Sequence, residues 1–586
     1  MKITRALLLS SKKQAEACYR RSLRADPRCP QAFHLLGLLE QQAGHYHESV
    51  RLIREALALN PDDVDALNSL ADTYLGQGQI PLAGACLERV AELCPQSAEA
   101  HHRVGKIQER LGNWEAAAVA YQRALGLQPD SPDLYGSLAR LQCKKGAFHE
   151  AIASCRHALA LDPSRHEIYT QLGNALTDLG RYAPAVEALR HALALKPDSA
   201  PAVFGLGYFF ERKGDLASAA QSYQTALRLD PSLEAALLHG GIISILQGEL
   251  ELAAGCFQRV LDLSPDSAEA RSFLGLIHLT QGHFSVGWKE YEARRGTQQF
   301  LRDRRTFVQP PWQGAPLAGE KILLYAEQGL GDTLQFVRYV PLVAARGAKV
   351  ILEVPSRLRR LLAATPGAEA VIAAGEALPE FDRQCPLLSL PLAFGTDLSS
   401  IPAAVPYIRP DPSEAEAWSR RMPANSLRVG LAWGGSPLHP YDARRSVPLA
   451  QLAPLTRLEG TTFYSLQLGD PAGQIGPLGT SVRLVDFKDE QKDFADTAAI
   501  VANLDLVIAI DTSVAHLAGA MAKPVWVMLN NSADWRWMLQ RADSPWYPTA
   551  RLFRQETPGA WDPVLREVTS ALAEWLRANA QGIAAN

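Results

Sequence analysis

The segment SAEAHHRVGKIQERLGNWEAAAVAYQRALGLQP, residues 97–129, decides the fold of the first half of the chain. It contains a helical pattern, a turn at Gly112, a second helical pattern and a stop at Pro129. This order predicts two consecutive helices, because glycine turns the chain and proline cannot continue a helix. Gly105, inside the first pattern, has no side chain and lets the two helices approach closely.

The same unit recurs with a period of 34 residues. Prolines, turn glycines and small residues all keep this period, so the register is fixed at three points in each unit. A helix–turn–helix unit of this length resembles the tetratricopeptide repeat and implies an α-solenoid. The recurring positions are Pro27, Pro61, Pro95, Pro129, Pro163, Pro197, Pro231 and Pro265; Gly44, Gly78, Gly112, Gly146, Gly180, Gly214, Gly248 and Gly282; and Gly37, Ala71, Gly105, Ala139, Gly173, Gly207, Gly241 and Gly275.

The repeats predict a superhelical domain over residues 1–297, with an incomplete first repeat. The register places Ile3 at the small position and Ser10 at the turn, so the chain opens inside a repeat. Either residues 1–10 are the remnant of a first helix, or the native chain begins upstream of Met1. At the other end, HFSVGWKEYEARR (283–295) replaces the second helix and no proline follows in register.

The concave groove of such a solenoid usually binds an extended segment of another protein. Repeats followed by an α/β domain resemble the plan of the protein O-GlcNAc transferases, whose groove carries an asparagine ladder for the acceptor backbone. That ladder is absent here, so other residues must recognise a protein acceptor. The equivalent positions hold Leu35, Ser69, Arg103, Ser137, Gln171, Gly205, His239 and Phe273.

After a polar linker at 298–319, short apolar runs alternate with helical patterns, which is typical of parallel sheets. Two sets of such runs predict two doubly wound, Rossmann-like lobes, at 320–410 and at 411–586, the second with a C-terminal helix. The predicted strands are KILLYAE (321–327), KVILEVP (349–355), AEAVIAA (368–374), a run near CPLLSL (385–390), LRVGLAW (427–433), TFYSLQL (462–468), VRLVDF (482–487), LDLVIAI (504–510) and PVWVML (524–529).

Three turns that follow predicted strands carry polar residues and glycines. Ligands of open α/β sheets bind at such turns, where a helix N-terminus offers free N–H groups and arginine can pair with phosphate. Together these turns suit a diphosphate. Their candidate residues are Gly329, Gly331 and Asp332 in the first turn; Gly434, Gly435, Ser436, Arg444 and Arg445 in the second; and Asp511, Thr512, Ser513 and His516 in the third.

The motifs GLGDTLQFVRYVP (329–341), AWGGSPLHPYDARRSVPL (432–449) and DTSVAHLAGA (511–520) resemble the glycosyltransferase family that includes the lipopolysaccharide heptosyltransferases, glycosyltransferase family 9-like proteins of GT-B fold. The resemblance covers about residues 320–575 and implies that Asp332 is the general base. It also implies that the third turn holds the diphosphate and sugar of a nucleotide-sugar donor. Arg444 or Arg445 matches the family's basic residue.

The resemblance predicts a glycosyltransferase that is inverting and independent of metal, with the lobe 320–410 on the acceptor side. Departures from the family are a short first lobe and Ser513 in place of a common glycine. The tandem-repeat plan also resembles bacterial transferases that glycosylate flagellin or other proteins. A protein acceptor bound by the repeats is therefore the leading hypothesis. The alternatives are a lipopolysaccharide or other glycan acceptor, and a non-catalytic scaffold with a degenerate transferase domain.

Three further features each have two alternative roles. Gln335 and Arg338 share a helix face, which faces either the acceptor or solvent. His516 either contacts the donor or is satisfied inside the lobe. The aromatic segment 530–548 either closes over the donor or packs the lobes together, and core packing is the simpler assignment for most of its tryptophans.

Composition limits the remaining possibilities. The net charge is −3 without long charged blocks, so nucleic acid is not the expected partner. No signal peptide and no stretch of about 18 apolar residues is present, which predicts a cytoplasmic protein without a transmembrane segment. The eight cysteines show no CxxC pattern, and no metal-ligand motif stands out. We therefore expect no metal and no cofactor besides the nucleotide-sugar co-substrate.

Overall fold

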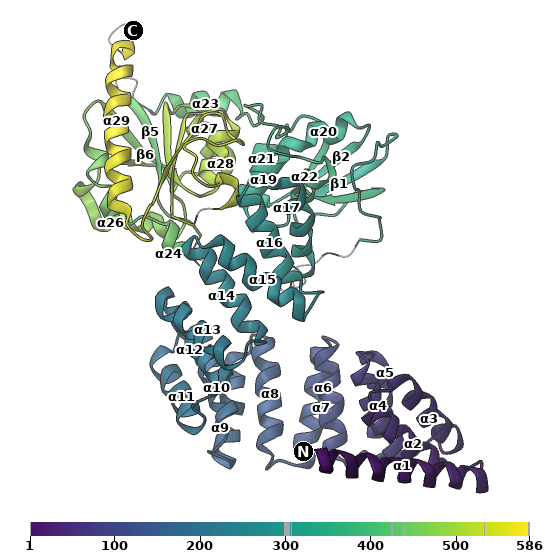
Figure 1. The fold of residues 1–586 in the computed structure, drawn as a ribbon. Coiled ribbons are helices and arrows are strands. Elements are labelled where there is room, and N and C mark those ends of the chain that lie inside the picture. The colour runs from purple at the N-terminus through teal and green to yellow at the C-terminus, as the bar shows by residue number, and fades with distance from the viewer. Residues whose placement is uncertain are drawn as a thin grey trace. The chain divides into compact units, whose positions relative to one another are not determined.

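The computed structural model describes residues 2–297, 300, 305, 307–422, 426–436, 441–532 and 534–583. The chain divides into two compact units, Met1–Ala236 and Leu237–Asn586. Figure 1 labels most helices and some of the strands.

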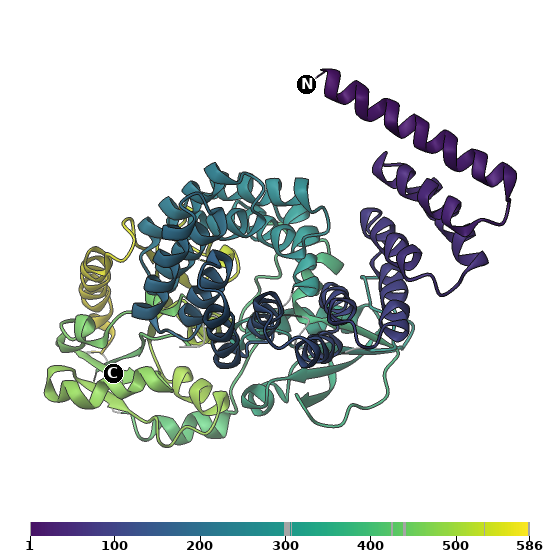
Figure 2. The ribbon, with the colours of Figure 1, turned by 90° about the horizontal axis from the view of Figure 1, so that it is seen from below.

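Helices alone build the first unit and the beginning of the second. Within the first unit, successive helix pairs follow one another along a curved path (Figure 2). The helices are α1 (Lys2–Ala25), α2 (Pro30–Gln42), α3 (Tyr46–Leu59), α4 (Val64–Gly76), α5 (Ile80–Leu93), α6 (Ala98–Arg110), α7 (Trp114–Leu127), α8 (Pro132–Lys144), α9 (Phe148–Leu161), α10 (His166–Asp178), α11 (Tyr182–Leu195), α12 (Ala200–Lys213), α13 (Leu216–Leu229), α14 (Glu234–Gln247), α15 (Leu250–Leu263), α16 (Ala268–Thr280) and α17 (Phe284–Tyr291).

The helix pairs predicted from the 34-residue period are confirmed. The eight turn glycines, from Gly44 to Gly282, have φ angles between +69° and +87°, a region that favours glycine. The small-residue position is equally constrained. A Cβ atom at Gly105 would lie 2.4 Å from Tyr121 Cε1, so only glycine lets α6 and α7 pack this closely.

Both ends of the repeat region differ from an ordinary unit. Helix α1 continues through Ser10, where the register predicts a turn, because serine lacks the conformational freedom of the turn glycines. At the other end, α17 has 8 residues against 14 in α15, and a 3-10 segment, η1 (Glu292–Gly296), follows it. The last unit therefore ends early.

The first sheet has four parallel strands in the order β3-β2-β1-β4. Part of the predicted linker, residues 298, 299, 301–304 and 306, lies outside the described residues. The strands and helices of this lobe are β1 (Lys321–Tyr325), α19 (Leu330–Phe336), η2 (Val337–Tyr339), α20 (Val340–Ala345), β2 (Lys349–Val354), α21 (Ser356–Leu362), β3 (Ala368–Ala373), β4 (Arg383–Pro386), η3 (Leu387–Ser389) and α22 (Leu390–Ala393).

The second sheet has six parallel strands in the order β10-β9-β8-β5-β6-β7. Its elements are α23 (Pro412–Ser419), β5 (Leu427–Ala432), α24 (Asp442–Arg445), α25 (Leu449–Leu452), η4 (Leu455–Arg457), β6 (Thr461–Ser465), η5 (Asp470–Gln474), α26 (Ile475–Leu478), η6 (Gly479–Ser481), β7 (Leu484–Asp486), α27 (Phe494–Ala502), β8 (Leu506–Ile510), α28 (Ser513–Ala520), β9 (Val525–Leu529), η7 (Trp535–Trp537), β10 (Ala550–Arg554) and α29 (Trp561–Ile583).

Both sheets are doubly wound. Counted from its own first strand, the second sheet has the order 3-2-1-4-5-6, and the first sheet has the shorter order 3-2-1-4. The strand order reverses between β1 and β4 in one lobe and between β5 and β8 in the other. These are the two places where a ligand is expected.

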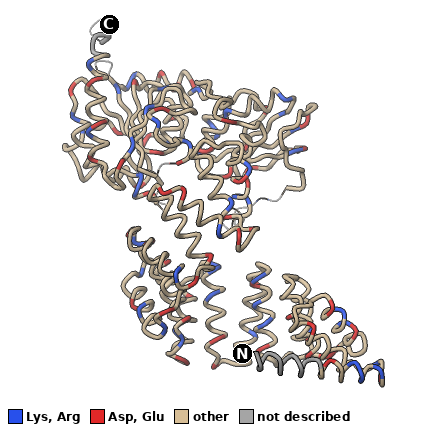
Figure 3. The backbone as a smooth tube through the Cα atoms, in the orientation of Figure 1, with Lys and Arg blue, Asp and Glu red and all other residues tan. Residues whose placement is uncertain are grey.

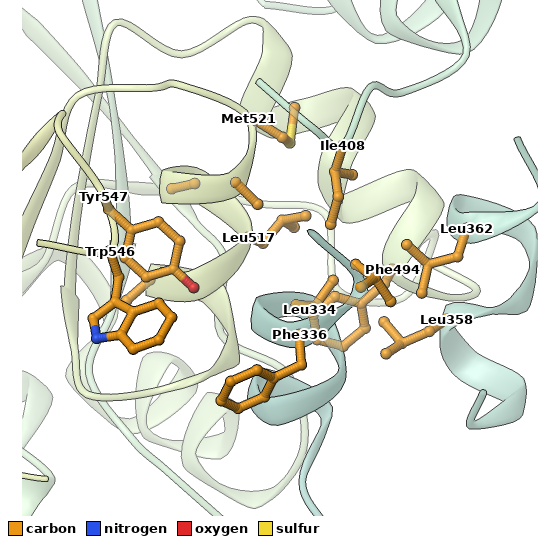
Figure 4. Packing of buried hydrophobic residues seen from close by; sticks show 14 of the residues in the cluster. Leu334, Phe336, Leu358, Leu362, Ile408, Phe494, Leu517, Met521, Trp546 and Tyr547 are labelled. Carbon is orange, nitrogen blue, oxygen red and sulfur yellow. The ribbon is translucent and has the colours of Figure 1, made fainter. Parts of the chain in front are cut away.

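A buried core joins the two lobes. Leu334 and Phe336 of α19 lie near Leu517 of α28 and Trp546, and Leu358 of α21 lies near Phe494 of α27 (Figure 4). The aromatic segment 530–548 belongs to this core. Its buried aromatic residues are Trp535, Trp537, Trp546 and Tyr547, so core packing describes this segment.

The end of the repeat region belongs to the same core. Leu279, Phe284, Trp288 and Tyr291 are buried in one cluster with the lobes, and Trp288 Nε1 donates to the Thr396 carbonyl at 2.9 Å. The repeats that follow Ala236 therefore fold with the α/β domain. A division of the chain into independent parts at residue 297 would cut through this core.

Charges of both signs are spread over each unit (Figure 3). This distribution matches the small net charge of the sequence, −3.

Candidate functional site

The carboxyl ends of strands from both sheets open into one cleft of about 1550 Å³. The turns after β1, β5 and β8 line it, and these turns flank the two points where strand order reverses. The following predicted site residues line the cleft: Gly329, Gly331, Asp332, Gly434, Gly435, Ser436, Arg445, Asp511, Thr512, Ser513 and His516.

The helices α19 and α28 meet at their N-terminal ends across this cleft. A Cβ atom at Gly331 would lie 2.8 Å from His516 Cδ2 and 3.6 Å from Ser513 Cα. Glycine at 331 is therefore required for this approach of the two lobes. The first and third predicted turns thus lie side by side.

Asp332 contacts both lobes. Its Oδ2 accepts a hydrogen bond from the Gly329 N–H at 2.7 Å, which caps α19, and its Oδ1 forms an ion pair with Arg536 of the second lobe. Burial raises the pKa of Asp332, and Arg536 opposes that rise. The residue therefore caps its helix and also carries a buried carboxylate at the cleft.

Arg536 is a site residue that the sequence prediction missed. Its Nη1 donates to Asp534 Oδ1 at 2.7 Å and its Nε donates to Gln335 Oε1 at 2.6 Å. Burial alone would lower the pKa of Arg536, but the negative charges of Asp534 and Asp332 outweigh burial and raise the pKa above its ordinary value. The guanidinium is therefore held charged. The signal in the sequence was an arginine between two tryptophans, Trp535 and Trp537. An arginine that is buried together with such neighbours needs carboxylate partners, because an unpaired charge is costly inside a protein.

The N–H groups of the turn after β5 are already used. Gly434 N–H donates to Gln467 Oε1 at 2.8 Å, and Gly435 N–H donates to Ser446 Oγ at 3.0 Å. A Cβ atom at Gly435 would lie 2.0 Å from Asp442 Oδ1. These glycines permit close packing of the turn, and their N–H groups already have hydrogen-bond partners.

The structure separates the two adjacent arginines of this turn. Arg445 lines the cleft and its Nε donates to Asp442 Oδ1 at 2.9 Å. Arg444 instead donates from Nη2 to the Leu246 carbonyl at 2.8 Å, near the C-terminal end of α14. Burial lowers the pKa of Arg444. Of the two, Arg445 is placed to meet a ligand in the cleft.

The turn after β8 combines a helix N-terminus with buried titratable groups. The first N–H groups of α28 have no partner within the helix, and Thr512 and Ser513 line the cleft there. Burial and the nearby Asp534 raise the pKa of Asp511. Its Oδ1 lies 3.9 Å from His516 Nε2, too far for a hydrogen bond.

His516 is held inside the protein. Its Nδ1 lies 2.9 Å from the Tyr547 hydroxyl, and its ring stacks on Trp537 with centroids 5.4 Å apart. Burial and the positive charges of Arg536 and Arg338 lower its pKa well below the ordinary value, so the ring is neutral at physiological pH. Its edge nonetheless reaches the cleft.

Gln335 and Arg338 do not face an acceptor or solvent, contrary to both sequence-based alternatives. Arg338 is buried and donates to the Trp546 carbonyl at 2.9 Å and to the Tyr407 hydroxyl at 2.8 Å. Gln335 is buried against Arg536. Gln335 lies at the end of α19 and Arg338 in η2, and both side chains contact groups of the second lobe.

The repeat region also contributes to the cleft, which the sequence did not predict. Arg294 of η1 donates from Nη2 to Glu327 Oε1 at 2.6 Å and to Ser389 Oγ at 2.9 Å. Glu327 follows β1 and Ser389 follows β4. Burial raises the pKa of Glu327, and Arg294 opposes that rise. The signal in the sequence was Glu327, a charged residue at the end of the apolar run KILLYAE (321–327), but nothing near Arg294 indicated this contact.

Two features are absent from the residues that the structure describes. Among those residues, no three His, Cys, Asp or Glu side chains are grouped so that they could hold a metal ion. None of the helices described there combines the length and apolar character needed to cross a membrane.

Comparison with known families identifies the repeats. Residues 34–98, 105–166, 170–234 and 247–285 match the model of the tetratricopeptide repeat. The chain therefore contains tetratricopeptide repeats, which are followed by a domain with parallel sheets.

A curated relative is the protein FlbA of Caulobacter vibrioides, which is 30% identical over 319 residues. The match covers 49% of this chain and 52% of FlbA, so the chain spans about half of the length of that relative.

Two solved structures are similar to part of the chain. TTC0263 of Thermus thermophilus is 24% identical, and the match covers 30% of this chain and 95% of the TTC0263 chain, with a TM-score of 0.29. Yeast Tom70 is 16% identical, and the match covers 50% of this chain and 62% of the Tom70 chain, with a TM-score of 0.36.

Proposed function

We propose that the chain is a glycosyltransferase that transfers a sugar from a nucleotide-sugar to a hydroxyl group of a protein. The observation that carries the proposal is the meeting of the turns after β1 and β8 across one cleft, with Gly331 against His516. This arrangement supports a GT-B-like pair of lobes. The cleft, at about 1550 Å³, exceeds the usual volume for one small ligand and leaves room for donor and acceptor together.

In the proposed reaction, the acceptor oxygen attacks the anomeric carbon of the donor while the bond from that carbon to the phosphate oxygen breaks. Asp332 accepts the proton of the hydroxyl. A carboxylate has about four lone-pair sites, so the contacts with Gly329 and Arg536 leave sites for this proton. Burial moves the pKa of Asp332 toward the range in which a general base works well.

The electron pair of the broken bond remains on the departing nucleoside diphosphate. The N-terminus of α28 at Thr512 and Ser513 and the guanidinium of Arg445 provide fixed positive charge at the cleft. These groups would stabilise the leaving group without a metal ion. Activity is therefore expected to survive EDTA.

The acceptor is proposed to be a protein because the chain carries tetratricopeptide repeats. Repeat solenoids provide extended recognition surfaces. The short first lobe, whose sheet has four strands, offers less surface for an acceptor of its own.

A non-catalytic scaffold is the second candidate, and the contacts of Asp332 favour it. The carboxylate caps its own helix and pairs with a buried arginine, as a residue that only holds two lobes together would do. The two candidates differ in whether the protein consumes a donor.

The test is consumption of UDP-, GDP- and dTDP-sugars by the full chain in EDTA, measured as release of nucleoside diphosphate. The proposal predicts turnover of at least one donor and at least about a 10²-fold loss in Asp332→Asn, a typical general-base contribution. Asp543→Asn is the matched control, because that side chain is 68% exposed and pairs only with its neighbour Arg541 among the described residues. If the folded protein releases no diphosphate from any donor, the scaffold is the better account.

A further inference from the structure

Hydrogen bonds join the first helices of neighbouring repeats at a sequence separation of 35 residues. His34 Nε2 lies 2.8 Å from Ser69 Oγ, and His102 Nε2 lies 2.9 Å from Ser137 Oγ. Between these two pairs, Arg103 donates to Asn68 Oδ1 at 2.8 Å. Side chains of α2, α4, α6 and α8 therefore satisfy one another from repeat to repeat.

This series of hydrogen bonds stops at the next repeat. The position equivalent to His102 is Gly136, which has no side chain to offer Gln171 of α10. The Oε1 atom of Gln171 is buried and has no hydrogen-bond partner in the described part of the chain. A buried polar atom without a partner is uncommon and calls for an explanation.

A second amide side chain on α10 also has a buried oxygen atom without a hydrogen-bond partner in the described part of the chain. The Oδ1 atom of Asn174 is also buried without a partner among the described residues. Gln171 and Asn174 are three residues apart and so lie on one face of α10. A Cβ atom at Gly205 would lie 2.7 Å from Asn174 Oδ1, so glycine on the following repeat makes room for this amide.

A cavity of about 600 Å³ lies beside Gln171, within the range of ligand sites. Its two arginines are already paired. Arg140 contacts Glu109 at 3.1 Å, and Arg165 contacts Asp133 at 2.8 Å. Burial lowers the pKa of His102, which favours its neutral form. The lining also includes Lys106, Glu99 and Glu167, so charges of both signs surround the cavity. Such a lining suits a neutral group that both donates and accepts hydrogen bonds better than a phosphate or a carboxylate.

We propose that Gln171 and Asn174, with the cavity beside Gln171, form an amide site that binds the main chain of an extended polypeptide. An amide side chain can accept from a peptide N–H and donate to a peptide carbonyl, so it recognises the backbone of many sequences. The inference rests on the proposed recruitment of a protein by the repeats. Its test measures binding alone, so loss of catalysis would not imitate its failure.

The probe is a phage-displayed library of random 12-residue peptides selected on the full chain. Selected peptides are then synthesised with a fluorescent label, and Kd is measured by polarisation. We expect Gln171→Leu to weaken binding at least 10-fold and Asn174→Leu to weaken it at least 3-fold. Gln221→Leu is the control, because it removes an exposed amide from α13 and should change Kd less than 2-fold. Circular dichroism must show equal helix content in all variants.

A scan with backbone N-methylated peptides distinguishes main-chain from side-chain recognition. Methylation of at least one N–H should weaken binding to the wild type about 10-fold and have little further effect on Gln171→Leu, because the two changes remove the same contact. The proposal is overturned if no peptide is selected, if the scan gives equal losses in both proteins, or if oligonucleotides compete for the site in a manner that depends on Gln171.

Discussion

Arg294 and Glu327 form a buried ion pair, with Nη2 and Oε1 2.6 Å apart and side-chain exposures of 4% and 2%. The pair joins the last segment of the repeats to the end of β1. Removal of one member of a buried pair leaves an uncompensated charge and is strongly destabilising. The end of the repeats is therefore a structural part of the α/β domain.

Truncation should reveal this dependence. A fragment of residues 231–586 keeps Trp288, Tyr291 and Arg294 and should be folded and monodisperse. A fragment of residues 299–586 exposes the surface that these residues cover and leaves Glu327 unpaired. We expect it to aggregate or to melt at least about 10 °C lower by differential scanning calorimetry. Equal melting temperatures of the two fragments would contradict the described core.

The two adjacent arginines provide a matched pair of variants. Arg445→Met should weaken the affinity for nucleoside diphosphates at least 10-fold by calorimetry, because its guanidinium lines the cleft. Arg444→Met should leave that affinity within 3-fold, because Arg444 contacts Leu246 at the end of α14. If Arg444→Met weakens the affinity more than Arg445→Met does, the diphosphate does not bind beside Arg445.

Periodicity made most of the fold predictable. Proline, glycine and small residues recur at fixed separations, and each has a local cause that the structure displays, as at Gly105 against Tyr121. Parallel strands were visible as apolar runs because both faces of such sheets are buried. Strand β10 was missed because ARLFR places Arg551 on an exposed position of a short edge strand, so it lacks an apolar run.

The candidate site was predictable only where its residues follow strands directly. Asp332, Asp511 and Ser513 belong to turns whose position sheet topology determines. Arg536 and Arg294 reach the cleft from segments distant in sequence, so no local pattern indicates which groups they contact there. Arg338 was misplaced for the same reason, because the helix face that looked exposed packs against α28 and its neighbours.

Stability should depend on the ionisation of Asp511. Burial raises its pKa in the folded protein above the unfolded value, so ionisation costs stability and the cost grows as pH rises through the folded pKa. Asp511→Asn should therefore melt about 2 °C or more above the wild type at pH 7.5. The difference should disappear near pH 4, around the unfolded pKa of aspartate. An Asn variant that is less stable at pH 7.5 would show that the carboxylate is favourably paired.

Asp332 provides the most direct test of the proposed protein glycosylation. Cells that lack the protein are complemented with the wild type, with Asp332→Asn or with Asp543→Asn, and the intact masses of their proteins are compared. The account predicts that one or more proteins gain the mass of a sugar residue with the wild type and with Asp543→Asn, and that the gain is absent with Asp332→Asn. Identical mass profiles for the wild type and a folded, equally abundant Asp332→Asn would contradict the account.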